Sequence, residues 1–403
     1  MIFSVFTRKK RGKIALVFDI GSASVAGALV LFKTGETPKI IYTVQRDMIF
    51  QEELDATRLR GIMLKTLNEV AMDVQKNGVS HLKFTQMGSR VPEVAYCTLA
   101  SPWYATQTRM IRVKKDKPFD VTKQFIDDLM GAEIEAFKSS EEVRGYIGDD
   151  RASVMEKRLI QVKLNGYETS EPHGKKARSI EAALFVSVSP KELLKDIAGE
   201  IRRTYVVSEV EFSSFSLVAF DVLRNIAHHA DNFLFLDISG EVTDLTLVRS
   251  GILLETVTFP IGKRDIIRKL AKILKTNPAD ALSILHLYHE QNISTHHEDS
   301  IKVALFSAAG EWTSSFQNAL STLSESFAIP SKVFFTSDKD LEEWFASLIT
   351  KEQFAQFTMT DEKFDVTPVN AALLNDFCRF NSSAARDPFI MIETVFANKV
   401  RGL

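Results

Sequence analysis

The chain has 403 residues, of which 45% are hydrophobic and 25% charged, and its formal net charge is −2. This composition is typical of a globular protein with more than one core and excludes a disordered or fibrous chain. A net charge so close to zero gives no overall basic field that would bind nucleic-acid phosphates, so nucleic acid is not an expected partner. The two cysteines, Cys97 and Cys378, show no disulfide or metal-ligand spacing. No apolar run approaches the roughly 18 residues that cross a bilayer, and we expect a cytoplasmic protein.

The amino terminus combines an apolar tip with a basic cluster. Apolar side chains dominate residues 1–6, and cationic side chains dominate residues 8–13. A signal peptide has the opposite order, with charge before the apolar stretch. Two interpretations remain open: contact with the inner face of the cell membrane or with a partner, or a frayed end with solubilising charges.

The first part of the chain predicts an α/β layer. Three segments rich in β-branched residues are expected to be strands: residues 14–20, 25–32 and 39–44. A helix follows from about Leu59 to Val74, where apolar residues recur at helical spacing. A meander of three strands followed by a helix is the beginning of an α/β domain.

The middle of the chain predicts an inserted small domain. After a strand at residues 94–99, a strand at 108–113 and a helix at 121–137 lead into a charged region that ends at Gly174. The α/β order then resumes with a strand at 180–188, an amphipathic helix from Leu193 to Tyr205, a strand at 206–212 and a helix at 215–227.

A second meander repeats the first. Its expected strands are residues 233–238, 243–248 and 252–259, and a helix at 264–274 follows them. Helical segments continue to about Phe327, before a short strand at 332–335 and a last apolar helix that holds Trp344. This internal duplication predicts two domains of the same architecture.

Each meander carries an aspartate at the end of its first strand, followed by a tight turn. The two turns are Asp19-Ile20-Gly21-Ser22-Ala23-Ser24 and Asp237-Ile238-Ser239-Gly240-Glu241-Val242-Thr243-Asp244. Glycine lets backbone N–H groups approach a phosphate closely, and hydroxyls add further donors. The carboxylates of Asp19 and Asp237 would hold the waters of a Mg²⁺ ion. Seven residues are therefore predicted to bind a nucleotide clamped between the two domains: Asp19, Gly21, Ser22, Ser24, Asp237, Gly240 and Thr243.

These two turns resemble the phosphate motifs of the actin-like ATPases, with residues 14–31 similar to phosphate 1 and residues 233–248 similar to phosphate 2. The resemblance implies an α/β fold of duplicated actin/Hsp70-type (ribonuclease H-like) domains with an inserted α+β subdomain, and it implies ATP and Mg²⁺ as cofactors. Within that superfamily the chain looks most like the bacterial FtsA and PilM proteins. The segments that carry this likeness are Asn165-Gly166-Tyr167, Pro172-His173-Gly174-Lys175 and residues 257–262.

The resemblance also implies a division of the chain. Residues 13–104 and 179–230 would form the first actin-like domain, and residues 231–386 the second. Residues 105–178 would be the SHS2-type insert that stands at the place of subdomain 1C. Residues 387–403 would be an amphipathic carboxyl-terminal tail with Phe389, Ile392, Phe396 and Val400 near one helical face. This tail either docks on a membrane as in FtsA relatives or packs on its own domain.

FtsA-like proteins tether the tubulin-like FtsZ ring to the inner membrane and polymerise, whereas PilM caps a cytoplasmic tail of the type IV pilus machinery. The apolar and basic amino terminus fits PilM better, and residues 165–175 fit FtsA better, so the resemblance favours FtsA narrowly. The expected partners are therefore division or pilus proteins and further copies of the chain. A nucleotide-independent interaction module is the third alternative. A sugar kinase of the same fold would need a catalytic aspartate and a substrate cleft that no segment supplies.

The sequence departs from the family at the second of these turns and at the adenosine motif. Ser239 and Glu241 stand where phosphate 2 has glycines, and a carboxylate aimed at a triphosphate is repulsive. The adenosine motif has Thr336-Ser337-Asp338 in place of a glycine pair. Gln107 lies near the position of a water-orienting residue, but a surface glutamine is the simpler interpretation. The sequence thus predicts a scaffold that is at most a weak ATPase.

Overall fold

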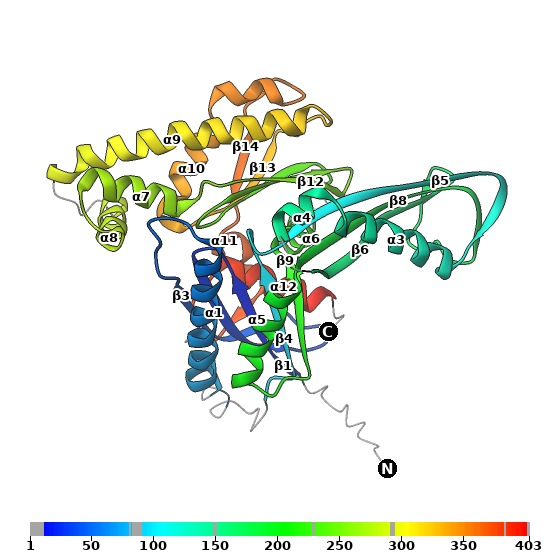
Figure 1. The fold of residues 1–403 in the computed structure, drawn as a ribbon, viewed down its shortest axis with the longest axis horizontal. Helices are drawn as coiled ribbons and strands as arrows, with labels where there is room; N and C mark the ends of the chain where they lie inside the picture. Colours follow the sequence, from blue (N-terminus) through cyan, green and yellow to red (C-terminus); the bar gives the residue numbers. More distant parts are fainter. Residues whose placement is uncertain are drawn as a thin grey trace, which may run out of the picture.

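The computed structural model describes residues 12–79, 82, 91–147, 151–227, 230–290, 295–382 and 384–400. Its strands form three sheets. Figure 1 shows two α/β bodies, one above the other, and a long two-layered arm that projects to one side. The apolar tip of the amino terminus and most of its basic cluster lie outside the described residues. None of the helices in these described ranges is both long and apolar enough to span a bilayer.

The lower body is built on a six-stranded sheet with the order β15-β3-β2-β1-β4-β9. Its strands are β1 (Lys13–Ile20), β2 (Ser24–Phe32), β3 (Lys39–Asp47), β4 (Val94–Leu99), β9 (Glu209–Ser214) and β15 (Arg379–Phe380). The meander β1–β3 is antiparallel, and β4 and β9 continue the sheet in parallel to β1. β1 and β2 are buried almost throughout, because helices cover both faces of the sheet.

Two pairs of helices provide this cover. α1 (Ala56–Asp73) and α5 (Lys191–Thr204) pack against each other on one face, where Met63, Leu67 and Ile197 are fully buried. α6 (Phe215–Ile226) and α12 (Pro388–Val400) pack on the other face. α11 (Ala371–Leu374) lies against α12.

The upper body repeats this plan with a sheet of order β12-β11-β10-β13-β14. Its strands are β10 (Phe233–Ile238), β11 (Thr243–Arg249), β12 (Ile252–Phe259), β13 (Lys332–Thr336) and β14 (Asp365–Pro368). Its helices are α7 (Lys263–Leu274), α8 (Pro278–His289), α9 (Thr295–Ser324) and α10 (Glu342–Ile349). Trp312 of α9 is fully buried at the centre of this core and stacks on Phe316.

The duplication extends to the register of the strands. In both bodies an antiparallel meander is followed by a parallel fourth strand, and Asp19 and Asp237 occupy the equivalent position, opposite Ala26 and Asp244 respectively. The predicted α/β class with duplicated domains is confirmed.

The arm is a four-stranded sheet of order β5-β8-β6-β7. Its strands are β5 (Ala105–Val121), β6 (Ala152–Leu164), β7 (Tyr167–Glu168) and β8 (Lys175–Pro190), and α3 (Lys123–Lys138) and α4 (Glu141–Ile147) lie beside them. Strand β5 is much longer than the predicted 108–113, because its charged stretch continues in the sheet past an irregularity between Lys114 and Phe119. The side-chain hydroxyl of Thr122 accepts the N–H of Phe125 and starts α3 at Lys123.

The carboxyl-terminal helix α12 packs within the lower body. Its buried residues include Ile390, Met391 and Ile392, which contact α6, β1 and β2. The apolar face expected from residues 389, 392, 396 and 400 is only partly buried, and Val400 is 54% exposed. Lys399 forms an ion pair with the buried carboxylate of Asp221 at 2.9 Å and ties the end of α12 to α6.

Candidate functional site

The turn between β1 and β2, residues 21–23, is here named the first turn. The N–H of Gly21 donates to the carbonyl of Ser24 at 3.0 Å, which closes the turn. The indole N–H of Trp103 donates to the Gly21 carbonyl at 2.7 Å. The carbonyl of Ala23 accepts the N–H of Met48 at 2.7 Å, so the segment after β3 also supports the turn.

The turn between β10 and β11, residues 239–242, is named the second turn. The N–H of Ser239 donates to the carbonyl of Val242 at 3.0 Å. The carbonyls of Ser239 and Gly240 accept the N–H groups of Lys263 and Arg264, at 3.0 and 2.8 Å. These bonds satisfy the first donors of α7, which would otherwise be free at the helix start. The second turn and α7 therefore form one rigid unit.

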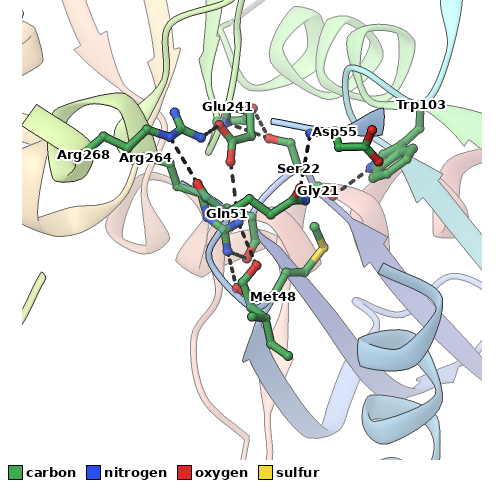
Figure 2. A network of polar contacts seen from close by, with 12 residues as sticks. Gly21, Ser22, Met48, Gln51, Asp55, Trp103, Glu241, Arg264 and Arg268 are labelled. Atoms are coloured by element: carbon green, nitrogen blue, oxygen red, sulfur yellow. Dashed lines mark hydrogen bonds and ion pairs between the residues drawn. The ribbon is translucent and has the colours of Figure 1, made fainter. Parts of the chain in front are cut away.

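The two turns touch. The Ser22 and Ser239 hydroxyl oxygens are 3.0 Å apart, and the N–H of Glu241 donates to the Ser22 hydroxyl oxygen at 2.9 Å. A Cβ added to Gly240 would lie 2.0 Å from the Cβ of Ala23, so the two main chains are in direct contact. Figure 2 shows Ser22 pointing from the first turn toward Glu241. The hydroxyl and the backbone donor that were expected to bind a phosphate bind each other.

The carboxylate of Glu241 turns away from the first turn and lies between two arginines of α7. Its side chain is 1% exposed and forms an ion pair with Arg268, together with a 3.5 Å contact to Arg264. This geometry removes the predicted repulsion between Glu241 and a bound anion, because the charge is neutralised inside the protein.

The aspartates of the two meanders, Asp19 and Asp237, are both buried. Asp237 accepts a hydrogen bond from the Thr336 hydroxyl at 2.8 Å, and burial, aided by the nearby Asp244, raises its pKa to about 7. Burial also raises the pKa of Asp19 well above its usual range, and Asp387 and Asp237 raise it further. The carboxyl of Glu393, from α12, has a pKa raised by burial and by Asp19.

Asp244 joins the two bodies directly. Its carboxylate accepts the hydroxyls of Ser101, which follows β4, and of Thr258 in β12, both at 2.6 Å. Burial raises its pKa. This contact lies beside the two turns and adds a second bridge between the lower and upper bodies.

The structure brings together only part of the predicted site. Ser22 and Gly240 lie where the turns touch, and Gly21 precedes Ser22 in the first turn. The Ser24 hydroxyl accepts a hydrogen bond from Gln45 within the first sheet at 3.3 Å, and the Thr243 hydroxyl donates to the Ile261 carbonyl at 2.7 Å. Among the described residues, no three carboxylate, histidine or cysteine side chains converge as a metal site would need.

A cavity of about 620 Å³ lies beside the predicted adenosine motif and is lined by Ser337, Asp338 and Asp387. None of the seven predicted binding residues lines it. The Ser337 hydroxyl donates to the Asp338 carbonyl at 3.3 Å, and the carboxylate of Asp338 pairs with Lys263 at 3.0 Å. Because the Ser22 hydroxyl and the Glu241 N–H bind each other and the two main chains touch, the turns in this arrangement do not fit a triphosphate held between them.

Sequence reasoning missed Arg264, Arg268 and Glu393. A signal for the arginines was present, since they stand one helical turn apart in the helix that follows the unexpected Glu241. Gln107, considered as a water-orienting residue, lies in β5 and accepts a hydrogen bond from Arg109 at 3.0 Å.

No protein-family model and no curated protein sequence matches the chain. A chain of the solved PilM-PilN type IV pilus biogenesis complex superposes with a TM-score of 0.62 at 15% sequence identity, and the match covers 96% of this chain and 98% of that one. The ethanolamine utilization protein EutJ from Carboxydothermus hydrogenoformans gives 0.43 at 9% identity, covering 96% and 89% of the two chains. MreB 5 of Spiroplasma citri, solved bound to AMPPNP, gives 0.42 at 11% identity, covering 96% and 97%.

The chain therefore has the actin-like ATPase fold. The superposition on the chain of the PilM-PilN complex spans nearly all of both chains. At 15% identity this likeness concerns the fold, and the FtsA-type role stays a prediction.

Proposed function

We propose that this chain is an assembly scaffold of the PilM type that works without a nucleotide and binds a segment of a pilus-assembly protein. The observation that carries the proposal is the direct contact between the two turns, in which the Ser22 hydroxyl and the Glu241 N–H bind each other. The likeness to the PilM chain supports the pilus role. The bound Mg²⁺ and ATP implied by the resemblance are not part of the proposal.

A groove at the base of the arm offers a place for the partner. It has a volume of about 560 Å³ and lies where β4 and β9 of the lower body meet β6 of the arm and the end of α12. Its apolar lining includes Met155, Phe212 and Phe396, while Lys157 and Arg158 add charge at the side of β6. A mixed apolar and charged groove of this size suits a short extended peptide better than a folded domain.

Val400 provides a test of this groove, because it lines the groove and is 54% exposed, so it can be changed without disturbing the core. We expect Val400→Asp to weaken binding of a PilN-type protein from the same organism by about tenfold, which corresponds to 1.4 kcal/mol. The measurement is titration of the purified proteins by calorimetry. Val303→Asp is the matched control, since Val303 is 59% exposed on α9 and does not line this groove.

Equal affinity for the two variants would place the partner elsewhere. Absence of any binding to the unaltered chain would overturn the pilus role.

The same titration with an FtsZ-type protein tests the division role. Liposome pelleting with a deletion of residues 1–13 tests membrane contact through the amino terminus. Sedimentation at increasing protein concentration tests self-polymerisation.

Nucleotide independence has its own test. Because the Glu241 N–H and the Ser22 hydroxyl are already bonded to each other, we expect Mg-ATP at about 1 mM to leave the unfolding midpoint of the unaltered chain unchanged. Calorimetry should detect no saturable heat. A rise in the midpoint that saturates with Mg-ATP would show that the turns open for the nucleotide and would remove this part of the proposal.

A further inference from the structure

The contact between α7 and the lower body contains a buried charge cluster that the scaffold function does not by itself explain. Glu241, Arg264 and Arg268 form this cluster, here named the latch. Its carboxylate is 1% exposed, and the two arginine side chains are 6% and 23% exposed. A buried charge is costly unless it is paired, so the three side chains depend on one another.

Arg264 crosses from the upper to the lower body. Its guanidinium donates to the carbonyl of Ala23 in the first turn at 2.9 Å and to the carbonyl of Met48, and a weaker contact reaches Ile49 at 3.5 Å. These acceptors lie in the first turn and in the segment that follows β3. The guanidinium thus satisfies main-chain carbonyls of one body while it is anchored to the helix of the other.

Arg268 lies one helical turn further along α7 and completes the cluster. Its Nε donates to the carbonyl of Gln51 at 3.3 Å, and its terminal nitrogen pairs with Glu241. The ring of Phe50 lies 5.5 Å from the guanidinium carbon of Arg264 and 5.3 Å from that of Arg268. Figure 2 shows both arginines converging on the Glu241 carboxylate.

Arg264 and Arg268 form an anion-binding site that is occupied by a carboxylate of the chain itself, that of Glu241. Two guanidinium groups face one carboxylate, and the backbone N–H of the same residue points to the first turn. Two arginines around an anion are the arrangement that proteins use for phosphate and carboxylate groups. Glu241 fills this place from the turn where the resemblance led us to expect glycine.

We propose that Glu241 is an internal anion that, with Arg264 and Arg268, holds the two bodies closed, and that its removal exposes a binding site for a phosphate-type anion. The inference rests on the nucleotide-independent closure proposed above and is independent of the partner groove. In this proposal Glu241 supplies the negative charge that neutralises the two arginines, in the place of an anionic ligand.

The test uses the full chain with Glu241→Gln, which keeps the side-chain shape and loses the charge. We expect its unfolding midpoint to be lower than that of the unaltered chain by about 3 to 6 °C, because the buried Arg264 and the partly buried Arg268 lose their counterion. Inorganic pyrophosphate at about 1 mM should restore about half of that loss or more in the variant and leave the unaltered chain unchanged. Sodium chloride at equal ionic strength controls for screening.

Two further variants complete the design. Glu298→Gln removes an exposed ion pair with Lys302 in α9 and should neither lose stability nor respond to pyrophosphate. Glu241→Gly opens more space and should respond to pyrophosphate as Glu241→Gln does.

The inference is overturned if neither Glu241 variant responds to pyrophosphate, or if the unaltered chain responds equally. It is also overturned if Glu241→Gln is as stable as Glu298→Gln. Partner binding by Glu241→Gln separates the two proposals: a variant that loses the latch and still binds the partner leaves the scaffold function standing.

Discussion

Gly240→Ala is expected to lower the free energy of unfolding by about 3 kcal/mol or more, one of the largest effects of a single methyl group in this chain. The added Cβ would lie 2.0 Å from the Cβ of Ala23 and 3.0 Å from its Cα and N atoms. Those atoms belong to the other body, and two of the three are main chain, so no side-chain rotation relieves the clash. The two turns would have to separate, which would break the Ser22 to Glu241 hydrogen bond.

The matched control is Gly310→Ala in α9, where an added Cβ meets no atom within 4 Å. This change should stabilise the chain by about 0.5 to 1 kcal/mol, since alanine favours a helix more than glycine does. Urea unfolding of both variants measures the difference. The double variant Gly240→Ala with Ala23→Gly should recover part of the loss, because it removes the closest contact. If Gly240→Ala and Gly310→Ala are equally stable, the turns are apart in solution.

The duplicated core of the fold could be predicted from the sequence because its signals are local. The apolar runs at 14–20 and 233–238 each carry an aspartate as their last residue but one and are followed by a turn, and the structure gives both the same register. A continuous apolar run followed by a tight turn is a local signal for such a hairpin. Such a hairpin depends on residues that are close together in the sequence and not on distant segments of the chain.

The state of the candidate site could not be predicted, because it depends on contacts between distant segments. Ser22 and Glu241 are 219 residues apart, and their hydrogen bond decides whether the turns bind a phosphate or each other. The sequence indicated only that a carboxylate at position 241 would repel a bound triphosphate. Arg264 and Arg268, which follow Glu241 by 23 and 27 residues, neutralise its carboxylate in the folded chain.

The carboxyl-terminal helix shows a different limit. Its apolar residues suggested a stripe at 389, 392, 396 and 400, and nothing in the sequence singled out Glu393. The structure buries Glu393, which is 2% exposed and lies beside Asp19. A buried carboxyl group breaks the rule that polar residues face solvent, and periodicity carries no information about such a pairing.

Because its pKa is raised, Asp237 should make the folded chain less stable as the pH rises. An ion-paired aspartate, whose pKa is lowered, has the opposite effect. Its pKa is raised from 3.8 to about 7, chiefly by burial, with Asp244 as the second cause. The folded chain therefore holds the proton more tightly than the unfolded chain. Its contribution to stability is complete below about pH 4 and is lost as the pH rises toward 7, with a total on the order of 4 kcal/mol. Asp19 and Glu393, whose pKa values are also raised, act in the same direction.

Asp237→Asn isolates this effect, because the amide oxygen still accepts the Thr336 hydroxyl and carries no charge. We expect the free energy of unfolding of the unaltered chain to fall more steeply between pH 4.5 and 7.5 than that of the variant, so that Asp237→Asn is the more stable protein at the upper end. Urea titrations at several pH values measure both slopes, and Glu298→Gln should follow the unaltered chain. Parallel slopes for the unaltered chain and Asp237→Asn would mean that Asp237 ionises as freely in the folded chain as in the unfolded one, which is incompatible with its burial between the two bodies.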